Sequence, residues 1–403
     1  MKLKSFLNRY FNKSMLSKKG ISRFRYEQFG GIVSSEHPPF LAWVDRDYMK
    51  NLGYDHSPLW DKPENTFLSA PTEVHFAVNN YCPLECNYCY KESTKRGKEI
   101  INTETFKKYL RQLSKMGVFH IALGGGEAFA RDDFLEISEY AREQGIIPNL
   151  TTNGYYITPE LAKRCHVFGQ INVSLDGLGP MYKKMRGHDH FSVALRAIEI
   201  LKKEKINIGI NCVVSRVNFN SLDKIVKFAG QKKLKDIEFL RFKPFGRGVQ
   251  NYNGHKLSPE QNREIYPKIL NLSKKYDMEL KIDCSFVPMM CCHKPNKEQM
   301  ERFAVYGCDG GNILLGITHD GRVAACSFAQ NDEYIDDLNN FWETSKHLND
   351  FRNWPQKAPK PCSSCDYLDI CKGGCHAVSL HVSNDFYAPD PECPIVAEYT
   401  KQS

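Results

Sequence analysis

Three cysteines, Cys82, Cys86 and Cys89, follow one another with the spacing CxxxCxxC. Cysteine thiolates hold both iron–sulfur clusters and structural zinc ions. A zinc ion would need a fourth histidine or cysteine close by, and residues 90–96 contain neither. Three thiolates on a four-iron cluster leave one iron without a protein ligand, and an open iron can bind a substrate. The spacing therefore favours an iron–sulfur cluster with one open iron over a zinc site.

A second pattern of seven cysteines lies near the C-terminus and has a CxxC pair at its centre. A zinc ribbon is the alternative interpretation, because CxxC pairs also bind zinc. Seven cysteines do not divide evenly into zinc sites of four cysteines each, so this pattern also favours iron–sulfur clusters. The seven are Cys308, Cys326, Cys362, Cys365, Cys371, Cys375 and Cys393.

The composition is typical of a globular protein, with 41% hydrophobic residues and no apolar run long enough to span a bilayer. No signal peptide is recognisable, so we expect a cytoplasmic protein. In that compartment fifteen cysteines indicate metal binding rather than disulfides. The formal charge of +8 indicates a mild preference for acidic partners, and we expect no nucleic-acid partner.

From residue 73 onward, apolar runs alternate with amphipathic segments. Alternation of this kind predicts a parallel sheet wound with right-handed crossovers. The expected strands are 73–79, 118–123, 147–151, 171–175, 207–214 and 236–242. The expected helices are 103–115, 132–144, 158–166, 191–204, 220–230 and 258–275.

Each polar motif of this region directly follows one of the expected strands. The cysteine loop follows the first strand, Gly124–Glu127 the second, Asn153 the third and Asp176 the fourth. In barrels of parallel strands, ligands bind at the carboxyl ends of the strands. Glycines at such an end let a ligand approach the backbone closely, because they have no Cβ. We therefore expect these motifs to meet at one site.

The cysteine loop and the segment Leu123-Gly-Gly-Gly-Glu127 together resemble the radical S-adenosylmethionine (SAM) superfamily. The resemblance implies an α/β fold with a partial (β/α)6 TIM-type barrel. It also implies that Glu127 accepts a hydrogen bond from the amino group of SAM. The family has a proline after this acid, where the present chain has Ala128. The resemblance assigns contacts with SAM to Tyr88, Gly125, Gly126, Glu127, Asn153, Ser174 and Arg186.

The resemblance further implies radical chemistry. SAM would bind the open iron of the cluster held by Cys82, Cys86 and Cys89. One electron would then cleave its sulfonium to methionine and a 5′-deoxyadenosyl radical, which abstracts hydrogen from an unactivated carbon. The cofactor carries this chemistry, and the protein orients it and excludes competing reactions.

The C-terminal pattern resembles the SPASM extension of radical SAM enzymes, which carries two auxiliary 4Fe–4S clusters. By that resemblance the first auxiliary cluster is held by Cys308, Cys326 and Cys375. The second is held by Cys362, Cys365, Cys371 and Cys393. Together with the SAM-binding cluster, the resemblance implies three 4Fe–4S clusters.

The first auxiliary cluster lacks one expected ligand. Several relatives have a further cysteine six residues before the first of this pattern, where the present chain has Arg302. The cluster would therefore keep an open iron or recruit Cys284, Cys291 or Cys292 from upstream. A water molecule or an unrelated side chain is the remaining alternative, and the sequence leaves all of these open.

Barrel and extension together most resemble peptide-modifying maturases of the mycofactocin and pyrroloquinoline quinone type. That resemblance implies oxidation of a ribosomally made peptide, and we expect a flavodoxin or ferredoxin as electron donor. Residues 27–70 do not look like a full leader-peptide-binding domain, so we expect leader recognition to need a separate protein. One alternative is an enzyme that modifies tetrapyrrole side chains in haem or haem d1 synthesis. Another is a non-catalytic electron-transfer protein, which the intact Glu127, Ser174 and Arg186 disfavour. A sulfatase maturase is disfavoured because Ser327 stands where those enzymes have an aspartate.

We divide the chain into a basic tail and cap segment (1–70), a radical SAM partial barrel (71–285) and a bridging region with the SPASM domain (286–403). Residues 1–26 carry eight Lys or Arg and no acid, with an amphipathic pattern. We expect a loosely ordered tail there, with contact to a membrane surface as the alternative. Residues 27–70 are expected either to cap the site or to pack against the barrel underside.

Three basic residues, Arg241, Lys243 and Arg247, lie in a segment shared with these maturases. They are expected either to face an anionic group of the substrate or to hold acidic neighbours. The sequence identifies no catalytic acid or base.

Overall fold

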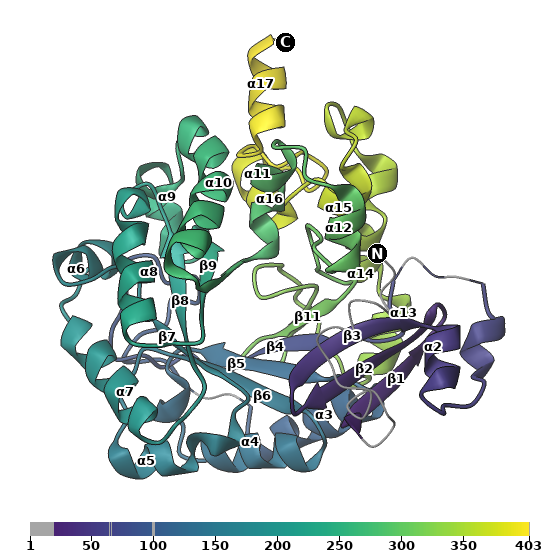
Figure 1. Cartoon of the computed structure of the whole chain (residues 1–403), viewed down its shortest axis with the longest axis horizontal. Coiled ribbons are helices and arrows are strands. Elements are labelled where there is room, and N and C mark those ends of the chain that lie inside the picture. Colours follow the sequence, from purple (N-terminus) through teal and green to yellow (C-terminus); the bar gives the residue numbers. More distant parts are fainter. Residues whose placement is uncertain (1–19, 64, 66, 99–100, 403) are drawn as a thin grey trace.

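The computed structural model describes residues 20–402 of the chain except 64, 66, 99 and 100. Its centre is a nine-stranded sheet in the order β10-β9-β8-β7-β6-β5-β4-β11-β12, parallel throughout except for the pair of β11 and β12. The sheet curves into an open barrel, and helices cover its outer side (Figure 1). The expected α/β partial barrel is thereby confirmed.

All six expected strands are present, and their ends differ from the expected ones by no more than two residues. Buried apolar residues such as Val74, Phe76 and Val78 make these strands easy to identify, because parallel sheets are covered on both faces. The strands are β4 (Glu73–Asn79), β5 (His120–Gly125), β6 (Ile147–Thr152), β7 (Ile171–Ser174), β8 (Ile208–Val214) and β9 (Asp236–Arg241).

The six expected helices are also present, and each buries residues of one face. In α3, Phe106, Leu110 and Leu113 are fully buried at helical spacing, and the side chain of Asn102 caps the first turn by accepting from the N–H of Thr105 at 2.9 Å. The six are α3 (Thr103–Lys115), α4 (Phe134–Glu143), α5 (Pro159–Arg164), α7 (Phe191–Lys203), α8 (Leu222–Gln231) and α10 (Pro259–Tyr276). Two shorter helices were not expected, α6 (Pro180–Arg186) and α9 (Gly248–His255).

Three short strands extend the sheet beyond the expected ones. At one edge β10 (Glu279–Ile282) pairs with β9. At the other, β11 (Leu314–Ile317) pairs with β4, and β12 (Val323–Ala324) pairs with β11. The C-terminal region thus continues the barrel sheet. Its helices gather on one side of that sheet, at the top and right of Figure 1: α11 (Val287–Cys291), α12 (Lys297–Arg302), α13 (Leu338–Thr344), α14 (Lys346–Arg352), α15 (Leu368–Cys371), α16 (His376–Ser383) and α17 (Pro394–Gln402).

The segment before the barrel forms its own antiparallel sheet, made of β1 (Arg23–Glu27), β2 (Gly30–Glu36) and β3 (Pro39–Asp45), followed by α2 (Arg46–Asn51). Arg25 donates to the carbonyls of Ala70 and Pro71, both at 2.8 Å, and Arg23 donates to the carbonyl of Ser114 at 2.8 Å.

These carbonyls lie near the amino-terminal ends of the barrel strands, and Glu36 of β2 pairs with Arg142 of α4 at 2.6 Å. The sheet of β1, β2 and β3 therefore packs against the barrel underside rather than over the site. The predicted amphipathic stretch of the basic tail lies mainly in residues 1–19, outside the described residues. In the described part of the chain, no helix is both long and apolar enough to cross a bilayer.

Candidate active site

The cysteine loop begins just after β4, and the side chain of Arg247 holds its backbone. Arg247 donates from Nε to the carbonyl of Cys86 at 2.8 Å and from Nη2 to the carbonyl of Ser93 at 3.0 Å. Its own N–H donates to the carbonyl of Cys89 at 3.1 Å. Arg247 therefore positions the loop and is not free to bind an anionic substrate group.

The glycine run after β5 lies directly against this loop. A Cβ on Gly126 would stand 1.9 Å from the carbonyl oxygen of Tyr81, and Gly125 has a φ of +114°, which favours glycine. The N–H of Glu127 donates to the same Tyr81 carbonyl at 2.7 Å. The two glycines are thus required by the close approach of two loops.

The carboxylate of Glu127 is buried and already accepts three hydrogen bonds. The donors are the hydroxyl of Thr152 at 2.7 Å, the N–H of Asn153 at 2.8 Å and the N–H of Phe129 at 3.4 Å. Burial raises the pKa of Glu127, and these hydrogen bonds oppose the rise. The carboxylate joins the ends of β5 and β6, and its bond to the amino group of SAM stays a prediction.

Asn153 and Ser174 stand at the ends of two neighbouring strands. The amide nitrogen of Asn153 lies 3.5 Å from the sulfur of Cys82, and its amide oxygen accepts from the N–H of Tyr155 at 2.8 Å. Ser174 is the last residue of β7. Both side chains line the same cavity as Cys82, so a ligand bound at the loop would meet them.

A buried carboxylate holds Arg186 beside the cysteine loop. Nε of Arg186 lies 2.7 Å from Oδ2 of Asp176, and Nη1 lies 3.7 Å from the sulfur of Cys86. The hydroxyl of Tyr88 donates to the same carboxylate. Burial alone would lower the pKa of Arg186, but Asp176 and Tyr88 raise it well above its ordinary value. Arg186 is therefore a permanent cation at the loop, suited to a carboxylate ligand.

One cavity of about 610 Å³ connects the barrel with the C-terminal region, and its size is that of a ligand-binding pocket. Its wall contains the three loop cysteines, which we call the loop set, and Cys308, Cys326 and Cys375, which we call the first C-terminal set. Two predicted cluster sites therefore open into one space.

The remaining four predicted ligands form a second C-terminal set and lie at a smaller cavity. Its wall contains Cys362, Cys365, Cys371 and Cys393, joined by Cys291. Burial raises the pKa of Cys362 to about 12, so its thiol stays protonated until a metal displaces the proton. Among the described residues, no three His, Cys, Asp or Glu side chains converge on a point that suits one metal ion. A 4Fe–4S cluster differs from one ion, since each of its cysteines binds a different iron.

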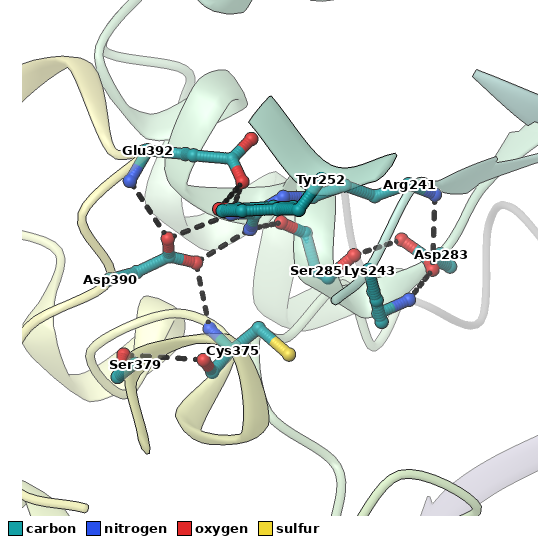
Figure 2. A network of polar contacts seen from close by, with 9 residues as sticks. All are labelled: Arg241, Lys243, Tyr252, Asp283, Ser285, Cys375, Ser379, Asp390 and Glu392. Carbon is teal, nitrogen blue, oxygen red and sulfur yellow. Dashed lines mark hydrogen bonds and ion pairs between the residues drawn. The ribbon is translucent and has the colours of Figure 1, made fainter. Parts of the chain in front are cut away.

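Arg241 and Lys243 hold acidic neighbours, which was the second of the two expectations. Arg241 donates to Asp390 from Nη1 at 2.6 Å and from Nη2 at 2.8 Å. Nζ of Lys243 lies 2.5 Å from Oδ2 of Asp283. Figure 2 shows both pairs within one network that joins the end of β9 to Cys375. The two cations thus fasten the barrel to the C-terminal region.

His75 is a residue of this site that the sequence analysis missed. Its Nδ1 lies 3.0 Å from Oγ of Ser327, and its Nε2 lies 2.9 Å from Oε1 of Glu73. All three residues line the large cavity. No local motif marks His75, because Ser327 is 252 residues away in the sequence and only the fold brings the two together.

Comparison with known proteins adds to this geometry. The model of the Radical SAM superfamily matches residues 77–229. The chain is 30% identical over 340 residues to a mycofactocin maturase of Mycolicibacterium smegmatis, a match that covers 81% of this chain and 83% of that protein. It is 27% identical over 356 residues to an Fe-coproporphyrin III synthase of Methanosarcina barkeri, covering 81% of this chain and 88% of that protein.

Among solved structures, the chain resembles Streptococcus suis SuiB bound to its precursor peptide SuiA. The TM-score is 0.72 at 18% identity, and the match covers 92% of this chain and 98% of SuiB. At this identity the likeness concerns the fold, and it extends over both the barrel and the C-terminal region.

Proposed function

Because the chain belongs to the radical SAM superfamily, whose enzymes bind SAM at a 4Fe–4S cluster, we propose that it oxidises a ribosomally made peptide. The substrate class rests on the 30% identity to a mycofactocin maturase over most of both chains. The reaction class rests on the site itself, whose chemistry comes from the bound cofactor while the protein positions and shields it.

The observation that carries the proposal is the shared cavity. In it the loop set and the first C-terminal set face the same space. A peptide side chain there would lie between the predicted SAM site and a predicted auxiliary cluster. Hydrogen abstraction at one wall and removal of an electron at the other would then act on one substrate.

The residues of the barrel have separate parts in this proposal. The loop set holds the SAM-binding cluster, and SAM supplies the 5′-deoxyadenosyl radical when bound there. Arg186 would meet the carboxylate of SAM, and Gly125 and Gly126 line the cavity beside the loop set, where the amino end of SAM would lie. Asn153 and Ser174 line the cavity beyond them and meet the nucleoside part.

The two C-terminal sets hold one auxiliary 4Fe–4S cluster each in this proposal. When a hydrogen atom is removed from the substrate carbon, the cluster held by the first C-terminal set would supply an acceptor for one further electron. A neighbouring atom of the substrate loses one proton, which makes the net reaction a two-electron oxidation.

We assign the proton to His75. Its ring is on the cavity wall, and Glu73 would stabilise the imidazolium that forms, since it lies 2.9 Å from Nε2. Ser327 lies 3.0 Å from Nδ1 and would connect the ring with the cavity. Sulfatase maturases have an aspartate at the position of Ser327. In the present chain Ser327 and His75 together would take the proton from the substrate instead.

The second candidate substrate is a tetrapyrrole, which the 27% identity to an Fe-coproporphyrin III synthase favours. The first electron in either case would come from a flavodoxin or ferredoxin. Leader recognition is assigned to a separate protein, because the sheet of β1, β2 and β3 lies at the barrel underside, away from the cavity.

The test is mass spectrometry of an anaerobic reaction that contains the reconstituted protein, SAM, a reductant and a short peptide encoded beside its gene. We expect a loss of mass from the peptide that matches the 5′-deoxyadenosine formed, and fragment ions would locate the new bond. If 5′-deoxyadenosine forms while every candidate peptide stays unchanged and a coproporphyrin is converted, the peptide proposal is wrong and the tetrapyrrole reading is right.

A further inference from the structure

The first C-terminal set has three cysteines, and the structure places a fourth sulfur at the same wall. Cys284 follows β10 and lines the large cavity together with Cys308, Cys326 and Cys375. We propose that Cys284 is the fourth protein ligand of the first auxiliary cluster. This inference rests on the proposed function, because it presupposes that the first C-terminal set holds a cluster.

The position of Cys284 is fixed from the barrel side by its neighbours Asp283 and Ser285. The N–H of Asp283 donates to the carbonyl of Phe239 at 3.1 Å, which continues the pairing of β10 with β9. The carboxylate of Asp283 lies 2.5 Å from Nζ of Lys243. Cys284 therefore sits at the end of a paired strand and between two fixed residues, as a ligand position requires.

A chain of polar contacts connects this segment with Cys375, as Figure 2 shows. The carbonyl of Ser285 accepts from Nη1 of Arg241 at 3.0 Å, and the same nitrogen lies 2.6 Å from Oδ2 of Asp390. That oxygen accepts from the N–H of Cys375 at 3.0 Å. Buried polar groups thus fix the segment of Cys284 relative to the segment of Cys375.

The charges around these sulfurs agree with a common site. Lys243 lines the large cavity together with Cys284, Cys326 and Cys375. One cation therefore shares this cavity wall with three sulfurs from three separate segments. Cysteine ligands bind metal as thiolates, whose negative charge a buried ammonium stabilises.

The other two upstream cysteines face elsewhere. Cys291 lines the smaller cavity with the second C-terminal set. Cys292 lines neither of the two cavities, and its sulfur contacts the carbonyl of Met289 at 3.2 Å. Arg302 forms an ion pair with Glu298 at 2.8 Å one helical turn away. Of the alternatives for the missing ligand, the geometry points to Cys284.

A cluster ligated by four cysteines has no iron open to the substrate. The assignment therefore makes the first auxiliary cluster an electron acceptor and leaves the binding of exogenous ligands to the loop set. It excludes the alternative in which a substrate atom binds this cluster directly.

The test uses the full chain with the substitutions Cys82→Ala, Cys86→Ala and Cys89→Ala. These remove the cluster of the loop set, whose open iron would otherwise bind cyanide. In this background we compare Cys284→Ala with Cys292→Ala, a matched upstream cysteine, and with Cys326→Ala. Each protein is assayed for iron and sulfide and for coupling to isotopically labelled cyanide by electron–nuclear double resonance.

We expect about eight iron atoms in the background and in Cys292→Ala, with no cyanide coupling, as two fully ligated clusters require. Cys284→Ala should either bind cyanide at an opened iron or lose about four iron atoms. A Cys284→Ala protein that matches Cys292→Ala in both readouts overturns the assignment while the proposed function stands. If the background holds only about four iron atoms, and Cys326→Ala neither loses iron nor binds cyanide, the first auxiliary cluster itself is absent and the proposed function fails with it.

Discussion

The loop set and the first C-terminal set face one cavity but are built in different ways. The loop set lies within residues 82–89, and its neighbours are groups that suit a ligand, such as the Arg186 cation and the amide of Asn153. The first C-terminal set with Cys284 comes from four segments between residues 284 and 375, which buried ion pairs hold together. The set proposed to bind SAM is thus built locally, and the set proposed to hold an auxiliary cluster is built by the tertiary fold.

The largest effect is expected from the loop set. Cys86→Ala should abolish the formation of 5′-deoxyadenosine, because SAM has no other open iron, while iron falls by only about one third. Cys165→Ala, which changes a buried cysteine of the barrel core, is the control and should keep both iron and activity. Residual SAM cleavage by Cys86→Ala, measured by chromatography, would contradict the claim that the loop set binds SAM and the first C-terminal set does not.

Breaking the buried ion pair of Arg241 and Asp390 should affect the first C-terminal set and leave the loop set intact. Asp390→Asn removes the carboxylate that pairs with Arg241, and leaving a buried charge with fewer partners should lower the free energy of unfolding by about 3 kcal/mol. Iron should be lost from the first C-terminal set, whereas the signal of the SAM-bound cluster stays.

Asp336→Asn is the matched control, since the Asp336 side chain is 99% exposed in its pair with Lys108. Denaturation curves and iron assays that do not distinguish the two variants would show that the Arg241 network is not what holds the first C-terminal set.

Substitution of His75 tests whether the proton acceptor lies in the cavity between the loop set and the first C-terminal set. If His75 accepts the proton, His75→Ala should lower product formation by roughly 10²- to 10⁴-fold while SAM cleavage continues. Ser327→Ala should show a smaller uncoupling in the same direction, because its hydroxyl contacts the ring at 3.0 Å. A parallel loss of product and 5′-deoxyadenosine would instead assign His75 to structure or SAM binding.

The smallest effect concerns Glu238, which lies on the cavity wall. Burial, together with the carboxylates of Glu73 and Asp283, raises the pKa of Glu238 to about 7. The ionised form is thus disfavoured in the fold. The loss of stability caused by ionising Glu238 is absent below its pKa in the unfolded chain, about 4.3, and complete only above its pKa in the folded protein.

Glu238→Gln should therefore raise the free energy of unfolding by roughly 1–3 kcal/mol near pH 8.5 and by about half as much near pH 5.5. Glu279→Gln, at a side chain that is 56% exposed on the neighbouring strand, is the control. An equal gain from Glu238→Gln at both pH values would contradict the raised pKa.

The barrel could be predicted closely because its strands are local patterns. Runs such as 73–79 and 208–214 are mainly apolar, with buried residues such as Val74, Phe76 and Ile210, and each barrel motif follows such a run. The sheet of β1, β2 and β3 was missed because β1 has only five residues, β2 begins with two glycines and β3 begins with a proline, and glycine and proline are depleted in strands. β10 has only four residues, two of them exposed, and gives too short a pattern to identify.

The partners of charged residues could not be predicted in the same way. Arg241 and Lys243 looked equally suited to a substrate anion and to acids of the protein. Arg241 finds its acid 149 residues downstream and Lys243 finds its acid 40 residues downstream. Such pairs depend on how the C-terminal region meets the barrel, which leaves no signal near either residue. The same is true of Cys284, whose neighbours in the sequence do not show which wall it faces.

The most direct test of the central claim is the electron paramagnetic resonance spectrum of the reduced protein before and after SAM is added. It is recorded for the unmodified chain and for the variant with Cys82→Ala, Cys86→Ala and Cys89→Ala. We predict that SAM changes the spectrum of the unmodified chain and leaves the remaining signals of the variant unaltered. A change in the variant, or none in the unmodified chain, would contradict the assignment of the open iron to the loop set.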